Sequence, residues 1–189
     1  MKKKKFKAKD GKKYTITKVW AYKNKYFCNK GKQKKANVEN IVIHNTGNYG
    51  RDTALANASY FKNKTGVYGG AHIIIDADGN IVQSGRLTDA CYSVGGSRYP
   101  NYKQTGGANY YSKCNNYNQV SIELAGIVDY KPTKKQIAAT KAVIEYIKKY
   151  CHNVKRIIRH FDVTGKDCPQ RYSGKANEKA WVEFKKKIQ

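Results

Sequence analysis

Short apolar runs alternate with amphipathic segments along most of this sequence. Each run has five or six residues and is bounded by polar or turn-forming residues, as buried strands are: 40–44, 71–76, 120–124 and 156–160. The segments between and after these runs carry apolar residues at helical spacing, which predicts helices over 53–64, 133–150 and 176–188. Strands that alternate with helices predict a single α/β domain with a mixed central β-sheet flanked by helices.

Capping and turn residues support these boundaries. Asp52 or Thr53 can cap the first helix, and Thr133 followed by Gln136 has the spacing of a capping box. The turn 76–80 contains Asp-Gly and predicts a β-hairpin between the apolar residues on either side of it. We also expect three residues of the first helix to face the core: Leu55, Ala58 and Phe61.

The first 37 residues differ in composition from the rest of the chain. They hold 15 lysines and one aspartate, and so carry +14 of a formal net charge of +25. We interpret residues 1–37 as a Lys-rich basic extension and residues 38–189 as the main domain. Within the extension we expect a flexible arm to about residue 13 and then a strand within 14–20, where apolar and polar residues partly alternate. A solvated tail with no role beyond solubility is the alternative.

Composition and charge exclude several classes of protein. With 40% hydrophobic residues among 189, the chain is too apolar to be wholly disordered. No apolar run approaches the roughly 18 residues of a membrane span. The large positive charge favours polyanionic partners, such as nucleic acid, anionic lipid or the acidic polymers of a bacterial wall.

The cellular compartment is constrained by the N-terminus and the cysteines. Lysines 2–5 resemble the start of a signal peptide, but no apolar segment follows them, so we predict synthesis in the cytoplasm without a signal peptide. Five cysteines at irregular spacing make a poor disulfide framework. We therefore expect reduced, mostly buried thiols at four of them: Cys28, Cys91, Cys114 and Cys151.

Two of the predicted strands end in a histidine. These are His44 and His160, and Cys168 follows eight residues after His160. Sites in α/β sheets gather where strands end, and two imidazoles with a thiolate form a good zinc ligand set that leaves a fourth position for water. The spacing alone leaves open two alternatives, namely structural histidines or a nucleophilic Cys168 paired with His160. We expect His72 and His152 to be structural.

Two charged residues are candidates for catalysis beside such a metal. Glu123 is a carboxylate within the apolar run 120–124, where a charge is rarely buried without a partner. It is either half of a buried salt bridge or a general base. Lys166 lies two positions before Cys168 and therefore stays near it, although a solvated loop lysine is an equal alternative.

Four segments, taken in order, carry a resemblance to a known family. They are 41–46 (IVIHNT), 70–75 (GAHIII) followed by Asp78-Gly79, 121–124 (SIEL), and 160–169 (HFDVTGKDCP). In these segments the chain resembles the zinc-dependent N-acetylmuramoyl-L-alanine amidases of the second type. That family includes phage endolysins, bacterial autolysins and the animal peptidoglycan recognition proteins, and the resemblance covers about 38–188.

The resemblance implies a site and a reaction. His44, His160 and Cys168 resemble the zinc ligands, and Glu123 and Lys166 resemble the catalytic pair. An enzyme of this kind hydrolyses the amide bond between the lactyl group of N-acetylmuramic acid and the L-alanine of the stem peptide in bacterial peptidoglycan. We accordingly expect an enzyme that acts on the cell wall after release and lyses the cell.

Three features depart from the family pattern. Ala71 stands where some members have a tyrosine, and the basic extension has no counterpart. The Tyr-rich stretch 98–117, within the predicted long loop 92–118, looks like an insertion.

Two alternative functions stay open, a non-catalytic peptidoglycan-binding module and a Cys-His nucleophilic wall hydrolase. We expect the extension to contact anionic wall polymers or a membrane surface. We also expect a monomer that does not bind nucleic acid, because no nucleic-acid motif is recognised.

Overall fold

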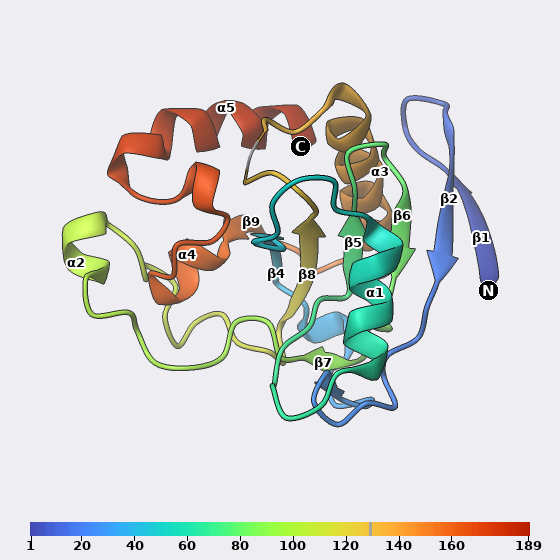
Figure 1. The fold of residues 1–189 in the computed structure, drawn as a ribbon, viewed down its shortest axis with the longest axis horizontal. Helices are drawn as coiled ribbons and strands as arrows, with labels where there is room; N and C mark the ends of the chain where they lie inside the picture. Colours follow the sequence, from blue (N-terminus) through green and yellow to red (C-terminus); the bar gives the residue numbers. More distant parts are fainter. Residues whose placement is uncertain (129) are drawn as a thin grey trace.

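The computed structural model describes residues 1–128 and 130–189 and has the predicted α/β architecture (Figure 1). Three strands lie side by side at one end of the sheet: β4 (Asn40–Asn45), β8 (Gln119–Leu124) and β9 (Arg156–Arg159). Strand β4 lies between the other two and is parallel to both. Three of the four predicted runs are therefore neighbours in the sheet.

The predicted hairpin is confirmed. Strands β5 (Ile73–Ile75) and β6 (Ile81–Gln83) are antiparallel, and β5 is parallel to β8 on its other side. Asp76 closes the turn, since its Oδ1 accepts a hydrogen bond from the Asn80 backbone at 3.0 Å. The sheet contains both parallel and antiparallel neighbours, so it is mixed as predicted.

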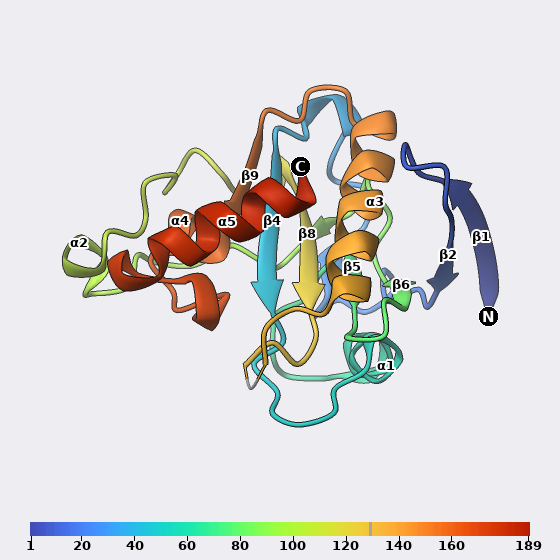
Figure 2. The ribbon, with the colours of Figure 1, turned by 90° about the horizontal axis from the view of Figure 1, so that it is seen from above.

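The prediction of a flexible arm over the first 13 residues is wrong. The chain forms an antiparallel hairpin of β1 (Lys2–Lys7) and β2 (Lys13–Lys18), and β2 pairs in parallel with β6. The sheet order is β1-β2-β6-β5-β8-β4-β9, with the hairpin at one edge (Figure 2). Ile16 is fully buried, and Phe6 stacks on Tyr14 with ring centroids 5.8 Å apart. The lysine-rich strand thus keeps one packing face, because alternate residues of a strand point to opposite sides.

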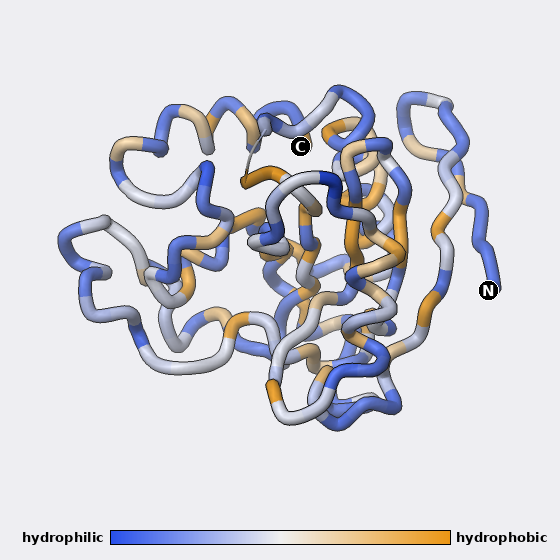
Figure 3. Tube along the Cα trace, viewed as in Figure 1, coloured by the Kyte–Doolittle hydropathy of each residue, from blue (hydrophilic) through white to orange (hydrophobic). Residues whose placement is uncertain are grey.

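Helices cover both faces of the sheet. On one face α3 (Lys134–Tyr150) and α5 (Glu178–Ile188) pack in one hydrophobic cluster with the sheet. On the other face α1 (Ala54–Asn63) packs against β5 and β6 through a second cluster that includes Ile74 and Phe61. The apolar residues accordingly concentrate in the central strands, whereas the edge hairpin is mostly hydrophilic (Figure 3).

The helix ends agree with the capping signals, with two differences. Thr53 and Thr133 cap α1 and α3 by accepting hydrogen bonds from backbone N–H groups. The Gln136 side chain does not complete the capping box, because its amide donates instead to the carbonyls of Ile75 and Ala125, which ties α3 to the sheet. Leu55 is 43% exposed, so its predicted inward orientation is wrong. The buried residues of α1 follow the helical spacing one position earlier: Ala54, Asn57, Ala58 and Phe61.

The remaining elements are short. Strands β3 (Cys28–Asn29) and β7 (Ala90–Cys91) form a second sheet, and the predicted loop 92–118 is irregular apart from α2 (Tyr102–Thr105). Helix α4 (His160–Thr164) follows β9, and three 3-10 turns complete the fold: η1 (Lys35–Asn37), η2 (Gln170–Tyr172) and η3 (Lys175–Asn177). All five cysteines are free and buried, in agreement with the prediction of reduced thiols. Within residues 1–128 and 130–189, no helix has the length and apolar character needed to cross a membrane.

Candidate metal centre

Three adjacent strands bring His44, Glu123 and His160 into one row. In the parallel pairing of β4 with β8, His44 lies directly opposite Glu123. On the other side of β4, Ile43 lies opposite Arg159, so His160, the next residue, lies beside His44. The two imidazole rings have centroids 4.8 Å apart. This row lies on the α1 face of the sheet, because Ile74, the β5 neighbour of Glu123, packs in the α1 cluster.

The turn that carries His160 is held by a buried ion pair. Arg159 directly precedes α4, and Asp162 lies in the first turn of this helix. The distance between Arg159 Nη2 and Asp162 Oδ1 is 2.6 Å. The Arg159 backbone N–H also donates to the Asp162 carboxylate at 2.7 Å. Glu178 also approaches Arg159 Nη2, at 2.9 Å, and a buried charge that is paired and hydrogen-bonded in this way fixes local geometry well. The orientation of His160 therefore depends on this pair.

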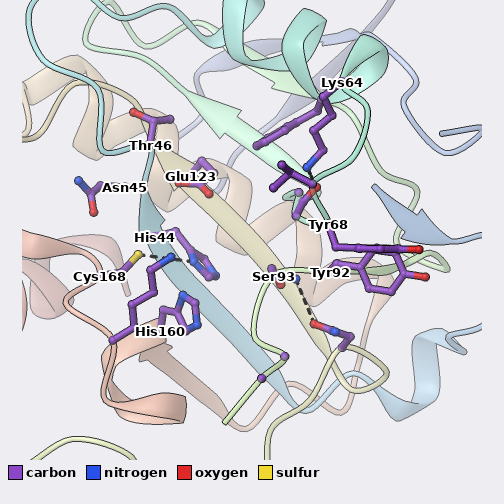
Figure 4. A pocket seen from close by; sticks show the side chains of 18 of the residues that line it. His44, Asn45, Thr46, Lys64, Tyr68, Tyr92, Ser93, Glu123, His160 and Cys168 are labelled. Carbon is purple, nitrogen blue, oxygen red and sulfur yellow. Dashed lines mark hydrogen bonds between the residues drawn. The ribbon is translucent and has the colours of Figure 1, made fainter. Parts of the chain in front are cut away.

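Cys168 reaches the two histidines through a turn after α4. The chain reverses at Gly165, which has a positive φ of 81° and whose missing Cβ would lie 2.7 Å from the Tyr102 side chain. The Phe161 backbone N–H then donates to the Cys168 carbonyl at 2.8 Å. The Cys168 Sγ lies 3.7 Å from His44 Nδ1, and one candidate ligand atom from each of the three residues lies within 4.8 Å of the others (Figure 4).

The Tyr-rich loop braces this turn from outside. Backbone N–H groups of Tyr99, Ala108 and Tyr110 donate to carbonyls of α4, at 2.8 to 3.0 Å. The sequence marked this loop as an insertion, and the structure gives it a defined contact with the element that supplies His160.

The three residues suit a metal ion. All are buried, and His44 Nε2 and His160 Nδ1 have no hydrogen-bond partner within the described part of the chain. Burial, with the charges of His160 and Lys166, holds the pKa of His44 well below its usual value, and burial with Lys166 lowers the pKa of His160 to about 3. Both imidazoles are therefore neutral, which is the form that binds metals. An orphaned buried nitrogen is costly, and a metal ion satisfies it.

The other histidines lie elsewhere, as predicted. His72 is buried, but its ring nitrogens lie 2.9 Å from the Ser121 hydroxyl and 2.8 Å from the Asp89 carbonyl, so both are occupied. His152 is exposed after the end of α3. Among the described residues, the group of His44, His160 and Cys168 is the only one with metal-ligand spacing.

Glu123 is a partly buried carboxylate without a counter-ion. Its Oε2 is inaccessible and has no hydrogen-bond partner, and none of the ion pairs in residues 1–128 and 130–189 includes it. The salt-bridge alternative is therefore not realised. Burial raises the pKa of Glu123 to about 7, with Lys166 opposing the rise and Asp52 adding to it. A carboxylate with a pKa near neutrality can both accept and return a proton.

Lys166 contributes charge to the site from its rim. Its side chain is exposed and lines the same cavity as Glu123 and the three candidate ligands. Its charge lowers the pKa of both His160 and Glu123. The structure therefore brings together all five candidate residues.

The site opens into a cleft of about 630 Å³. In the view of Figure 4, Lys64, Tyr68 and Tyr92 lie on the side away from Cys168, with Glu123 between. The sequence did not single out these three residues. For Tyr68 and Tyr92 the only signal is the abundance of tyrosine, and Lys64 is one of many lysines.

A second polar group lies behind Glu123 and was also not predicted. Asp52 accepts a hydrogen bond from the Thr46 hydroxyl at 2.5 Å and another from the Asn57 amide at 2.6 Å. These residues line a small cavity that also reaches Glu123. Asp52 was expected only as a candidate helix cap, a role that Thr53 fills instead. Its negative charge is one reason why the pKa of Glu123 is high.

Comparisons with known proteins identify a family and a fold. The sequence matches the family model for N-acetylmuramoyl-L-alanine amidase over residues 34–171. The structure is similar to the catalytic domain of XlyA, with a TM-score of 0.65, 22% identity, and coverage of 92% of this chain and 99% of that one. It is also similar to a mutant endolysin from Bacillus subtilis, with a TM-score of 0.65 and 23% identity, and the match covers 92% of this chain and 98% of that one. For the N-acetylmuramoyl-L-alanine amidase LysC from Clostridium intestinale URNW, the TM-score is 0.54 and the identity is 20%. That match covers 92% of this chain and 98% of the other. A search of curated proteins finds no match.

The structural similarity confirms the predicted fold, and the family match confirms the predicted family. That match spans well over half of the chain, from the end of the basic extension to the turn after Cys168. It includes every candidate site residue. The chain belongs to the N-acetylmuramoyl-L-alanine amidase family and is a peptidoglycan amidase.

Proposed function

We propose that this amidase uses one zinc ion, held by His44, His160 and Cys168, to hydrolyse the bond between the muramoyl lactyl group and L-alanine. The observation that carries the proposal is the buried cluster of two neutral imidazoles and one thiol, with unsatisfied nitrogens, beside a carboxylate that has an inaccessible, unpaired oxygen. Three protein ligands leave one position open, which is typical of catalytic rather than structural zinc. Zinc bound there supplies a Lewis acid that activates water and polarises a carbonyl.

The protein residues then divide the remaining chemistry. Glu123 accepts the proton of the attacking water and delivers it to the leaving amine of L-alanine, for which its pKa of about 7 is suitable. Lys166, at the rim of the same cleft, stabilises the negative charge that develops on the scissile carbonyl oxygen. The free carboxylate of Glu123 does not contact a cation in the described residues, so it is available for this proton transfer.

The nucleophilic-thiol alternative has less support. A catalytic thiolate needs a lowered pKa and an accessible position. Burial, with the nearby Glu123, raises the pKa of Cys168 to about 12, and the residue is buried. A metal that displaces the thiol proton explains the presence of a cysteine at this place better than a nucleophile does.

Metal analysis of purified variants tests the proposal. Wild-type protein should hold about one zinc per chain, and Cys168→Ser should lose both zinc and turnover, since the hydroxyl is a poor zinc ligand. Glu123→Gln should keep zinc and lose turnover. Full activity after complete chelation would favour the thiol mechanism, and a zinc-loaded, fully active Cys168→Ser would refute the ligand set.

We also propose a role for the basic extension. With α3, the hairpin encloses a groove of about 1000 Å³ that contains two acidic residues, Asp10 and Glu145, and the aromatic rings of Phe6, Tyr146 and Tyr150. Seven lysines line the same groove: Lys4, Lys5, Lys7, Lys9, Lys141, Lys148 and Lys149. This excess of positive charge favours an anionic wall polymer as the partner. Residues 1–37 are then a wall-docking extension of the catalytic domain 38–189.

Charge neutralisation tests this docking role without removing the strand. Lys5→Gln/Lys7→Gln should bind isolated cell walls more weakly and with a flatter salt dependence, because exposed charges are screened over about 10 Å at 0.1 M salt. Lys186→Gln/Lys187→Gln, exposed on α5, has the same change in net charge and is the control. Equal wall binding by both variants would refute the groove, and a loss confined to anionic lipid vesicles would identify a membrane as the partner.

The oligomeric state and the place of action also belong to the proposed function. We propose that the enzyme acts as a monomer. We propose that the enzyme reaches the cell wall after release from the cytoplasm and that cleavage of stem peptides lyses the cell.

A further inference from the structure

Lys64 is a nearly buried cation at the edge of the cleft. It follows the last turn of α1, and only 9% of its surface is exposed, whereas most lysines of this chain are exposed. Its ammonium donates to the carbonyl of Gly69 and lies over the rings of Tyr60 and Phe61, 5.8 and 5.5 Å from their centroids. No carboxylate in residues 1–128 and 130–189 lies within ion-pair distance of it.

This arrangement is unusual because lysines normally extend their ammonium into water. Burying an ammonium without a counter-ion is costly, and here burial lowers the pKa of Lys64. A carbonyl and two aromatic faces offset only part of the lost hydration. The position is therefore better suited to a state in which an anion is present.

Anchoring of the neighbouring loop does not account for Lys64. The Asn24 amide already donates to the Lys64 carbonyl at 2.9 Å and to the Phe61 carbonyl at 3.0 Å. Farther along, the backbone N–H groups of Gly69 and Gly70 donate to other segments, at 3.0 and 3.1 Å. These bonds hold both ends of the loop independently of the ammonium.

The cleft connects Lys64 to the candidate zinc site. Both line the same cavity, and Glu123 lies between them in Figure 4. A substrate whose scissile carbonyl lies at Glu123 can thus extend toward Lys64. In peptidoglycan the N-acetylated sugars are uncharged, whereas the stem peptide beyond the scissile bond carries free carboxylates. A buried cation in this cleft selects the peptide side of the substrate.

We propose that Lys64 forms a subsite for the first free carboxylate of the stem peptide, at the residue after L-alanine. This inference rests on the proposed function, because it places the scissile bond at the zinc site. Lys64 acts as a specificity-determining residue: the substrate carboxylate becomes the missing counter-ion of the ammonium. Amidation of that carboxylate removes the charge and leaves the ammonium without a partner, so amidated peptides are the poorer substrates.

The test compares two synthetic muramoyl dipeptides that differ only in a carboxylate or a carboxamide on the second residue. Wild type should prefer the carboxylate by about 10- to 100-fold in kcat/KM, as expected for a charged hydrogen bond in a desolvated site. Lys64→Met should lose this preference, mainly through a higher KM for the carboxylate substrate. Lys64→Arg should restore part of it. Lys62→Met, which replaces an exposed lysine in the last turn of α1, is the matched control and should behave as wild type.

The outcomes separate this inference from the proposed function. Equal use of both dipeptides by wild type would overturn the subsite while leaving the amidase proposal intact. A Lys64→Met variant that loses both substrates equally, with a lower melting temperature, would show a structural role instead. Calorimetric binding of the same dipeptides to Glu123→Gln measures the preference without turnover, so the subsite is tested even if wild type hydrolyses neither.

Discussion

Replacing Glu123 with glutamine probes the burial of this carboxylate separately from its chemistry. In the zinc-free folded protein Glu123 stays protonated until its pKa of about 7, whereas in the unfolded chain it ionises near 4.5. The unfolded state therefore releases the proton first as pH rises, and wild-type stability falls between about pH 4.5 and 7. The pKa difference corresponds to about 3 kcal/mol above pH 7. Glutamine has nearly the same shape and cannot ionise, so the variant avoids this loss.

Urea unfolding of chelator-treated protein measures the effect. At about pH 4 the two proteins should have similar unfolding free energies, and at about pH 8 Glu123→Gln should be more stable by ~3 kcal/mol, or roughly 6–12 °C in melting temperature for a domain of this size. Glu183→Gln, an exposed carboxylate of α5, should show no such difference. The zinc-loaded variant should at the same time lose about 10²- to 10⁴-fold in turnover. Equal stability of Glu123→Gln and wild type at pH 8 would refute the desolvated carboxylate.

Three further perturbations test other parts of the structure. Asp162→Asn leaves the buried guanidinium of Arg159 with only the half-exposed Glu178 carboxylate as a partner, so unfolding free energy should fall by about 1.5–3 kcal/mol, and chelator competition should reveal weaker zinc binding; unchanged zinc affinity would separate this pair from the site. Ile16→Ala should lower the free energy of unfolding in denaturant by about 2–5 kcal/mol, whereas replacement of the exposed Lys3 by alanine should change it by about ±0.5 kcal/mol. Equal changes in the two variants would mean that the hairpin does not pack on the domain. Asp52→Asn should lower the pKa of the catalytic carboxylate, so the acidic limb of the kcat/KM profile should move to lower pH; an unmoved limb would contradict the electrostatic link.

Local periodicity predicted the central part of the fold well. Apolar residues recur in the runs that became β4, β5, β8 and β9, and nearly all residues of these strands are buried, which is typical of strands covered on both faces. The strand predicted within 14–20 corresponds to β2, but β1 was missed because consecutive lysines conceal an alternation that only tertiary contacts complete. Lys4 illustrates this, since its ammonium lies 4.9 and 4.7 Å from the rings of Tyr146 and Tyr150, more than 140 positions away. The sequence cannot reveal such a partner.

The sequence predicted the site residues that form an unusual motif, and it did not predict those of common residue types. A histidine at a strand end, followed by a cysteine and a lysine in a short loop, is an unusual combination, and resemblance to a family made it specific. The register that places His44 opposite Glu123 depends on strand order, which the sequence does not state. Lys64 and Asp52 were missed because their significance comes from burial and from neighbours distant in sequence.

Mass spectrometry of products from purified peptidoglycan, digested with zinc-loaded and with chelated enzyme, tests the central claim most directly. Stem peptides with a free N-terminal L-alanine and glycan strands with free lactyl carboxylates should form only with the zinc-loaded enzyme. Products that retain the lactyl–alanine bond and are cut elsewhere would contradict the proposed reaction. The same products from fully chelated enzyme would contradict the role assigned to His44, His160 and Cys168.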